Sequence, residues 1–351
     1  MLFRQIGLPT EVGLEMVLGF VRCHQLETWF RELVYLEMGA HFGPEKWIKA
    51  EEALKRGLKR TGRKRIPADK KFLHMATLES DPLWFISFDS LLAIVCDEQL
   101  WPLFETYLIA KRLLEPRLEE IMLIRNRIAH CRSLHADDLN RLQLLLRDLD
   151  GGFWRFCISY KDTHPFITTD DRSDPVFQQF ADREEVRYME TEPGMNVTVQ
   201  YSVRPSADAE GARASGKGKL YHFTFSAVDN QRTMDYPQIL EHTKAHHGLV
   251  AHILLDQFLF VTFPALYGPE QIIKAAEDFY CQCSKFTPPL RGSAGKRRKN
   301  KTRTSEDGLK ENETANKRFE QIAVRWPHYV VPPSHPYRYL DPERRRSFFG
   351  A

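Results

Sequence analysis

Hydrophobic residues recur every three or four positions through most of the first 150 residues, and this spacing predicts a helical N-terminal part. The run EVGLEMVLGFVRCHQLETWFRELVYLEMGA (11–40) predicts a long helix that is broken at Gly39. The stretch HFGPEKW (41–47) predicts the turn that follows, and helix is expected again over residues 45–60.

Three further helices are expected before residue 150. Ser87 or Asp89 can cap the first of them, because both residue types accept hydrogen bonds from the first amides of a helix. The second begins at about Pro116 and contains IRNRIAH (124–130). The third covers HADDLNRLQLLLRDLDGG (135–152), with acidic residues in its first turn and a glycine pair after its last turn.

After residue 152 the hydrophobic period changes. FWRFCISY (153–160), MNVTVQYSVRP (195–205) and KLYHFTFSAV (219–228) alternate in the β-branched and aromatic manner of strands. Helix is expected around 235–255 and over 269–283, and the apolar FLFVTF lies between these two stretches. A second, α+β part is therefore predicted.

These patterns predict an α+β multidomain protein. Residues 1–150 form an all-α helical domain, and residues 151–287 form a mixed α+β domain with a regulatory or sensor role. Residues 288–317 are charged and almost without apolar residues, so they are interpreted as a flexible linker. Residues 318–351 are rich in proline and aromatic residues and are expected to dock as an extended strap.

Composition excludes few classes. The net charge of +3 does not by itself indicate nucleic acid, and the six cysteines show no pairing pattern. Charged residues among the first twenty positions argue against a secretory signal. The apolar segment 248–268 is interrupted by His252, Asp256 and Gln257, so it is not expected to span a membrane. A cytoplasmic protein with reduced thiols and no membrane partner is predicted.

No cofactor and no metal site are expected. The pair of thiols in CQC (281–283) has no second Cys or His pair at the spacing of zinc ligands. His246 and His247 likewise have no carboxylate or thiol at ligand spacing. All four side chains are interpreted as ordinary structural residues.

Basic residues cluster locally although the whole chain is nearly neutral. The segment 55–71 has nine Lys or Arg against a single Asp, which makes it the best candidate for contact with an RNA backbone; the alternative is a solvated loop. A second basic run, at 295–301, is interpreted as a solvated part of the linker. The candidate RNA-binding residues are Lys59, Arg60, Arg63, Lys64 and Arg65, together with Arg127 and Arg132 of the motif region.

The stretch RNRIAH within the second helix is unusual for an apolar helix face. Its predicted core-facing stripe consists of Leu114, Leu118, Ile121, Arg125 and Ile128. Arg125 thus takes the place of a hydrophobe, and a buried arginine needs a charge partner, a ligand or a water-filled cleft. Asn126 and His130 are four residues apart and share an adjacent face.

These residue types have a chemical use in common. RNA is cleaved without a metal when the 2′-hydroxyl is deprotonated, attacks its own phosphate and expels the 5′-oxygen. His130 can supply a base that works near neutral pH, Arg125 can bind the phosphate oxygens, and Asn126 can orient the arginine. The alternative is structural: Arg125 pairs with a carboxylate such as Glu119 or Asp148, and His130 ends the helix.

The surroundings of this motif resemble HEPN domains over about residues 10–150. The resemblance rests on PLWFISFDSLLAIV, Trp101 with Phe104, IRNRIAHCRSL and a closing helix, and the upstream YLEMGAHFGPEKWIKA is similar to the front of such a domain. The nearest branch is shared by bacterial abortive-infection-type proteins and a eukaryotic nuclear RNA-surveillance endonuclease. The C-terminal part resembles no particular family.

The resemblance implies a helical bundle that forms a homodimer, with two Arg-x4-His motifs facing each other and cleaving RNA without metal. It assigns phosphate binding to Arg125, support to Asn126 and acid–base chemistry to His130, in a toxin or anti-phage role. A tyrosine two residues after the histidine marks members silenced by a nucleotidyltransferase partner. Here that position is Arg132, so such silencing is not expected.

Other members of the family are catalytically silent scaffolds. The alternative function is therefore a HEPN scaffold that binds RNA or a partner protein without cleaving. In either case a regulatory protein or another trigger is expected to act on the C-terminal part.

Overall fold

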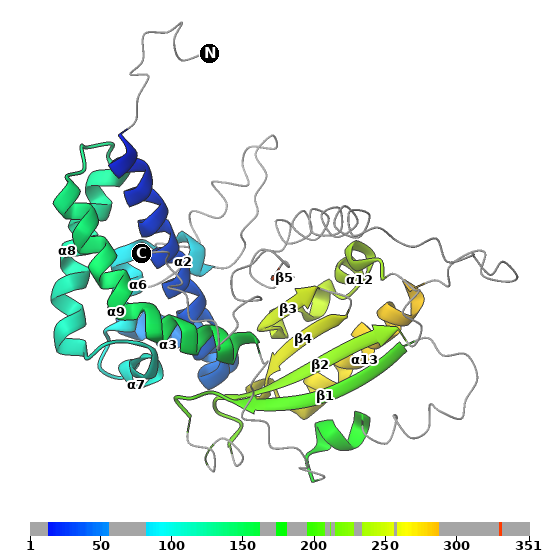
Figure 1. Ribbon diagram of the computed structural model, residues 1–351. Helices are drawn as coiled ribbons and strands as arrows, with labels where there is room; N and C mark the ends of the chain where they lie inside the picture. Colours follow the sequence, from blue (N-terminus) through cyan, green and yellow to red (C-terminus); the bar gives the residue numbers. More distant parts are fainter. Residues whose placement is uncertain are drawn as a thin grey trace, which may run out of the picture.

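The computed structural model describes residues 13–55, 82–161, 173–180, 195–207, 211, 215–227, 234–255, 258–287 and 330–331. A helical N-terminal region packs against a small, mostly antiparallel sheet in the C-terminal part, so the chain is α+β (Figure 1). The basic candidates Lys59, Arg60, Arg63, Lys64 and Arg65, the linker 288–317 and most of the tail lie outside the described residues.

The helical region is built around one long central helix. Its elements are α2 (Leu14–Phe42), η1 (Gly43–Glu45), α3 (Lys46–Leu54), η2 (Pro82–Phe85), α6 (Phe88–Val95), α7 (Trp101–Phe104), η3 (Glu105–Tyr107), α8 (Lys111–Ala129) and α9 (Ala136–Lys161). Within these described elements no helix is long and apolar enough to cross a bilayer.

Helix α2 does not break at Gly39 and continues to Phe42, so that prediction is wrong. Every residue from 33 to 41 is buried, which means that this half of α2 is packed on all sides. Tertiary packing of this kind outweighs the weak helix propensity of one glycine. Helix α3, in contrast, ends at Leu54 and is shorter than expected.

Helix α9 corrects a second prediction. It runs through the glycine pair to Lys161, so FWRFCISY is helical and not a strand. Leu149, Phe153 and Phe156 are spaced by four and three residues and are buried in the helical core. A Cβ at Gly152 would lie 1.6 Å from the carbonyl oxygen of Tyr107. This glycine therefore permits close packing of α9 on η3, and it does not stop the helix.

The remaining helical predictions hold with small shifts. Helix α8 begins at Lys111, five residues before Pro116, which lies inside its second turn. Ser87 precedes α6 as expected, but its Oγ atom pairs with Ser90 Oγ at 2.9 Å instead of with a main-chain amide.

The sheet contains β1 (Met195–Val203), β2 (Lys219–Ala227), β3 (His252–Leu255), β4 (Leu259–Pro264) and β5 (Val330–Val331), in the order β1-β2-β4-β3-β5. The strands predicted at 195–205 and 219–228 are confirmed, and most of the apolar FLFVTF forms β4. All pairs are antiparallel except that β5 runs parallel to β3. Two residues of the tail therefore dock in extended form, as expected.

The helix predicted over 235–255 is correct only in its first part. Helices α12 (Tyr236–His242) and η4 (Lys244–Leu249) are followed by β3, whose four residues are all buried. A short apolar run that is buried on both faces has no alternation that would distinguish a strand from a buried helix. The helix predicted at 269–283 is α13 (Pro269–Lys285).

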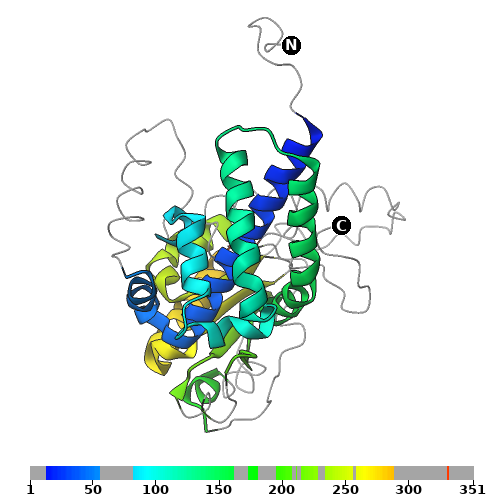
Figure 2. The same ribbon diagram turned by 90° about the vertical axis from the view of Figure 1, so that its left-hand side faces the viewer.

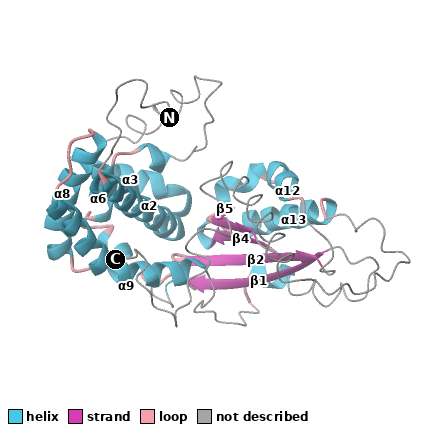
Figure 3. Ribbon diagram, turned by 45° about the horizontal axis from the view of Figure 1, so that its top comes forward, coloured by secondary structure: helices cyan, strands magenta, loops and turns pink. Residues whose placement is uncertain are grey.

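The two faces of the sheet have different partners (Figure 3). Phe223, Phe225 and Phe263 face α13 and pack around its Phe279. Leu220 and Leu254, on the opposite face, belong to the same hydrophobic core as α2.

A buried polar cluster also joins the sheet to α2. The carboxylate of Glu37 accepts hydrogen bonds from Arg204 Nε (2.9 Å), Tyr107 Oη (2.9 Å) and Ser206 Oγ (3.1 Å). Glu37 and Arg204 are 0% and 1% exposed, so the ion pair is enclosed. The sheet is therefore anchored to the same helix whose first half contacts the motif on α8.

Candidate functional site

The buried stripe of α8 differs from the predicted one by a single residue. Its members are Leu114, Leu118, Ile121, Ile124 and Ile128. Ile124 occupies the position that was assigned to Arg125, so the prediction that Arg125 lies on the buried stripe is wrong. Both spacings fit a helix of 3.6 residues per turn, and the one that keeps the charge at the edge avoids its desolvation. The Arg125 side chain is 32% exposed.

Arg125 is next to a carboxylate on another helix. Its Nη2 atom lies 3.5 Å from Glu27 Oε2 of α2. Arg125 therefore does pair with a carboxylate, as the structural alternative predicted, but the carboxylate is neither Glu119 nor Asp148. Glu119 is exposed, and Asp148 pairs with Arg117. Sequence reasoning missed Glu27. Its spacing of four from Arg31 was the available signal.

The carboxylate of Glu27 is itself held in place by a buried arginine, Arg31. It pairs with Arg31, whose guanidinium also donates to the carbonyl oxygens of Leu83 and Ile86, the latter at 2.9 Å. Burial lowers the pKa of the Arg31 guanidinium, and the hydrogen bond to Glu27 opposes that shift. Arg31 is 5% exposed, so Glu27 is the outer member of a largely buried pair to which Arg125 is attached at the surface.

His130 lies at the turn between α8 and α9, and its side chain is exposed, as is that of Asn126. The turn is fixed by main-chain bonds from His130 N to Asn126 O (3.1 Å) and from Arg132 N to Arg127 O (2.9 Å). Asp138 adds an ion pair with Arg127 at 2.7 Å. The imidazole therefore projects into solvent from a backbone that is held in place.

The start of α2 lies beside this turn, at one end of the bundle (Figure 2). A Cβ at Gly19 would lie 2.4 Å from Leu134 Cδ2 and 3.1 Å from Ile128 Cδ1, so the glycine allows α2 to approach α8 closely. One turn further on, burial raises the pKa of the Cys23 thiol to about 12, while Arg125 acts in the opposite direction. Cys23 is thus an unreactive thiol beneath the motif.

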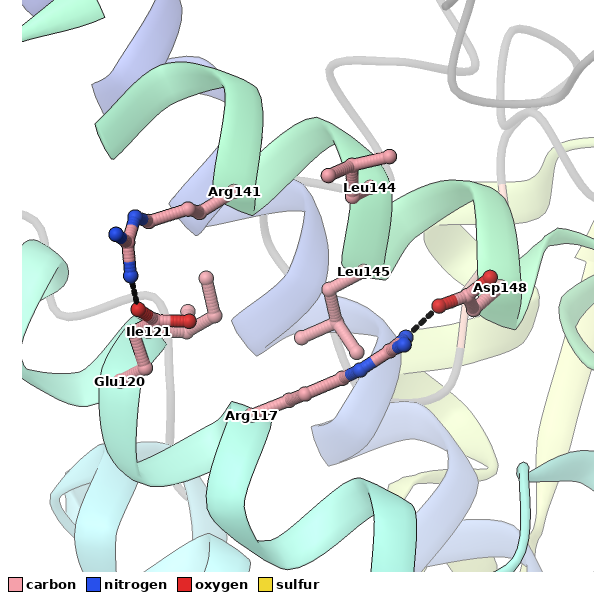
Figure 4. Close-up of a pocket in the computed structure, with 7 residues that line it drawn as sticks. All are labelled: Arg117, Glu120, Ile121, Arg141, Leu144, Leu145 and Asp148. Atoms are coloured by element: carbon pink, nitrogen blue, oxygen red, sulfur yellow. Dashed lines mark ion pairs between the residues drawn. The ribbon is translucent and has the colours of Figure 1, made fainter. Parts of the chain in front are cut away.

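A separate shallow groove of about 210 Å³ lies between α8 and α9 (Figure 4). Arg117 pairs with Asp148 and Arg141 pairs with Glu120 across the two helices. The side chains between these pairs are apolar: Ile121, Leu144 and Leu145. Since both arginines are neutralised, the groove has no uncompensated charge for a ligand, and its ion pairs serve to brace the motif helix against α9.

The other candidates divide into three groups. Arg127 is partly engaged by Asp138, whereas Arg132 is exposed beside His130. The basic segment 55–71 has only Lys55 among the described residues, so its relation to the motif stays a prediction. His246 pairs with Asp278 at 3.0 Å, and the described residues contain no group of three metal-ligating side chains.

No protein-family model, curated protein or solved structure matches this chain. One end of the helical bundle presents an exposed imidazole, an exposed amide and a partly exposed guanidinium. His130 follows Arg125 by about 7.5 Å along the helix axis, a separation that one nucleotide phosphate and its ribose can span.

Proposed function

We propose that this protein is a metal-independent endoribonuclease of the HEPN kind, acting on RNA in a toxin or anti-phage role. The observation that carries the proposal is the state of Arg125. Its guanidinium is at the surface, and its one ion-pair distance is 3.5 Å, longer than a tight charge-assisted hydrogen bond. An RNA phosphate can replace Glu27 as its partner at small energetic cost.

The reaction assigns one step to each group. His130 accepts the proton of the 2′-hydroxyl, and the resulting oxygen attacks the adjacent phosphorus. Arg125 binds the oxygens on which negative charge grows, and Asn126, whose Oδ1 lies 3.5 Å from Arg125 Nη1, orients the guanidinium. The 5′-oxygen leaves with a proton from a second, protonated histidine. The products are a 2′,3′-cyclic phosphate and a 5′-hydroxyl.

A homodimer would supply that second histidine from the other copy of the motif. Three aliphatic side chains at the motif end of α2 support such an association, because they are left in water: Leu14, Val17 and Val21 are 67%, 47% and 41% exposed. The resemblance to HEPN domains supports the same arrangement. The sheet region, anchored to α2 through Arg204, is positioned to report a trigger or a regulatory protein to the motif.

A second candidate function is a scaffold that binds RNA or a partner protein without cleaving. The ion pair between Glu27 and Arg125 favours the scaffold function, because it gives the guanidinium a structural partner. The two functions differ in one measurable respect, which is the chemistry at the ends of the RNA.

The deciding experiment is an RNA cleavage assay in EDTA. Purified wild type is compared with Arg125→Ala, His130→Ala and the control Arg112→Ala, which removes an exposed arginine from the same helix. We expect 2′,3′-cyclic phosphate ends from wild type and Arg112→Ala only, with a loss of at least about 10²-fold in the other two. Equal cleavage by all four proteins refutes the assignment, and binding without cleavage by wild type supports the scaffold.

A further inference from the structure

Two aromatic rings on α2 are exposed at the end of the bundle that carries the motif. Phe20 is 60% exposed, and His24 is also exposed. Their rings are parallel to within 1°, with centroids 6.2 Å apart. A phenylalanine left largely in water is unfavourable unless something covers it, so this pair is a candidate binding surface.

The position of Phe20 follows from helix geometry. Phe20 and Glu27 are seven residues apart, which places them on the same side of α2, and Glu27 contacts Arg125. Helices α2 and α8 run in opposite directions, with the start of α2 and the end of α8 together (Figure 2). Along the helix axes, Phe20 lies about 10 Å from Glu27, and His130 lies about 7.5 Å from Arg125. Both displacements point toward the same end of the bundle.

Phe20 therefore lies at about the level of His130 along the bundle, on the exposed side of α2 next to the face that meets α8, and His24 lies one turn further along the same side. The close approach at Gly19, the neighbour of Phe20, to Ile128 and Leu134 confirms this level. Arg125 and the exposed Arg132 add positive charge to the same end of the bundle. Exposed aromatic rings beside cations are the combination that proteins use to hold unpaired nucleotides: the rings stack on bases and the cations bind phosphates.

We propose that Phe20 and His24 form a stacking platform for one unpaired nucleobase next to the phosphate held by Arg125. The site then selects single-stranded RNA, because a base within a duplex cannot leave its stack to reach the rings. The inference rests on the proposed ribonuclease function and names its class of substrate.

A nucleobase fits this surface better than a second copy of the chain does. The aliphatic residues Leu14 and Val21 lie about 120° and 100° around the helix from Phe20, and Val17 lies about 60° away, next to His24. This aliphatic strip therefore borders the Phe20 face on the side away from Glu27 and Arg125. The face with Phe20 is bordered by Glu27, Arg125 and His130, which are polar groups that an apolar protein contact would have to desolvate.

The test measures binding of a fluorescent single-stranded RNA that carries 2′-O-methyl groups and so cannot be cleaved. The full-length chain is compared with Phe20→Leu, Phe20→Tyr and the control Leu113→Ala, which truncates an exposed leucine at the opposite end of α8 from the motif. We expect Kd to rise roughly 5- to 100-fold for Phe20→Leu, and to stay within about twofold for Phe20→Tyr and Leu113→Ala. Binding of a duplex of the same sequence should not change. Light scattering and thermal melting of each variant exclude altered assembly and misfolding.

Several outcomes would overturn the platform. One is equal affinity of wild type and Phe20→Leu for the single strand. Another is a loss of binding by Phe20→Leu that accompanies a change in oligomeric state, which would mark the surface as a protein interface. The binding RNA cannot react, so the result is independent of catalysis. Absence of cleavage with an aromatic-dependent Kd would refute the ribonuclease alone, and cleavage with no dependence on Phe20 would refute the platform alone.

Discussion

The carboxylate of Glu27 is shared by two arginines, and we expect the two ion pairs to differ in strength. Arg31 is 5% exposed and is held by two main-chain carbonyls as well as by Glu27. Arg125 is about a third exposed and lies 3.5 Å away. The first pair is in a low-dielectric environment, whereas the second is screened by water.

Magnitudes follow from this difference. Removing one partner of a fully buried ion pair costs about 3–5 kcal/mol. Glu27 is 19% exposed, and Arg31 keeps its two carbonyl acceptors, so we expect a coupling free energy of about 2 kcal/mol between Glu27 and Arg31. For Glu27 and Arg125 the range of exposed pairs applies, about 0.2–1 kcal/mol.

Two double-mutant cycles measure these couplings. One combines Glu27→Gln with Arg31→Met, and the other combines Glu27→Gln with Arg125→Met. The free energy of unfolding is determined by urea denaturation for each single and double variant. Glu27→Gln itself should retain cleavage within about tenfold of wild type, because Gln preserves the shape of the site while Arg125 meets the phosphate.

An Arg125 coupling equal to or larger than the Arg31 coupling would refute this difference in strength. If the ion pair with Glu27 contributed about 2 kcal/mol or more, Arg125 would be a structural residue. Moving its guanidinium from Glu27 to a phosphate would then destabilise the folded protein. In that case the scaffold function would be the better interpretation of the motif.

Two further predictions concern stability away from the motif. Arg204→Met should lower the free energy of unfolding by about 3–5 kcal/mol, because it leaves the buried Glu37 without its cation. In the same urea titration the control Arg112→Met, at an exposed position, should change it by under about 0.5 kcal/mol. A loss under about 1 kcal/mol for Arg204→Met would contradict this prediction. Burial lowers the pKa of His247 from 6.5 to about 4. As the pH falls, His247 is therefore protonated in the unfolded chain before it is protonated in the folded one. Its contribution to the free energy of unfolding is fully present above pH 6.5 and falls by about 3 kcal/mol as the pH drops to 4. Urea titrations at several pH values should show a shallower fall for His247→Gln, and an unchanged slope would exclude this histidine as the cause.

Local patterns in the sequence were sufficient for much of the fold. The alternation over 195–203 and the β-branched and aromatic residues over 219–227 predicted β1 and β2. In β1 the start of the alternation matches burial, since Met195 and Val197 are buried and Asn196 and Thr198 are exposed, whereas the first five residues of β2 are buried on both faces. The helical period of α8 and the polar end of that helix were also visible, and they placed Asn126 and His130 together on a face next to the buried stripe; the structure shows that both are exposed.

The wrong predictions of secondary structure have one physical origin. Local sequence signals do not report which other element packs against a segment. The glycine pair before FWRFCISY has the form of a helix stop, but Gly152 exists because η3 approaches α9 there. Strand β3 is buried on both faces and so lost its alternation. Gly39 could not break α2, because that half of α2 is enclosed by its neighbours.

The sequence by itself determined the helical N-terminal region, the strands with alternating exposure and the residue types of the motif. Only the tertiary structure decided that Ile124 takes the buried position and Arg125 the edge, that Glu27 is the partner of Arg125, and that Gly19 meets Ile128 and Leu134. These are contacts between helices that are distant in the sequence. A spacing along one helix determines which side a residue occupies, but the packing of α2 against α8 determines what that side meets.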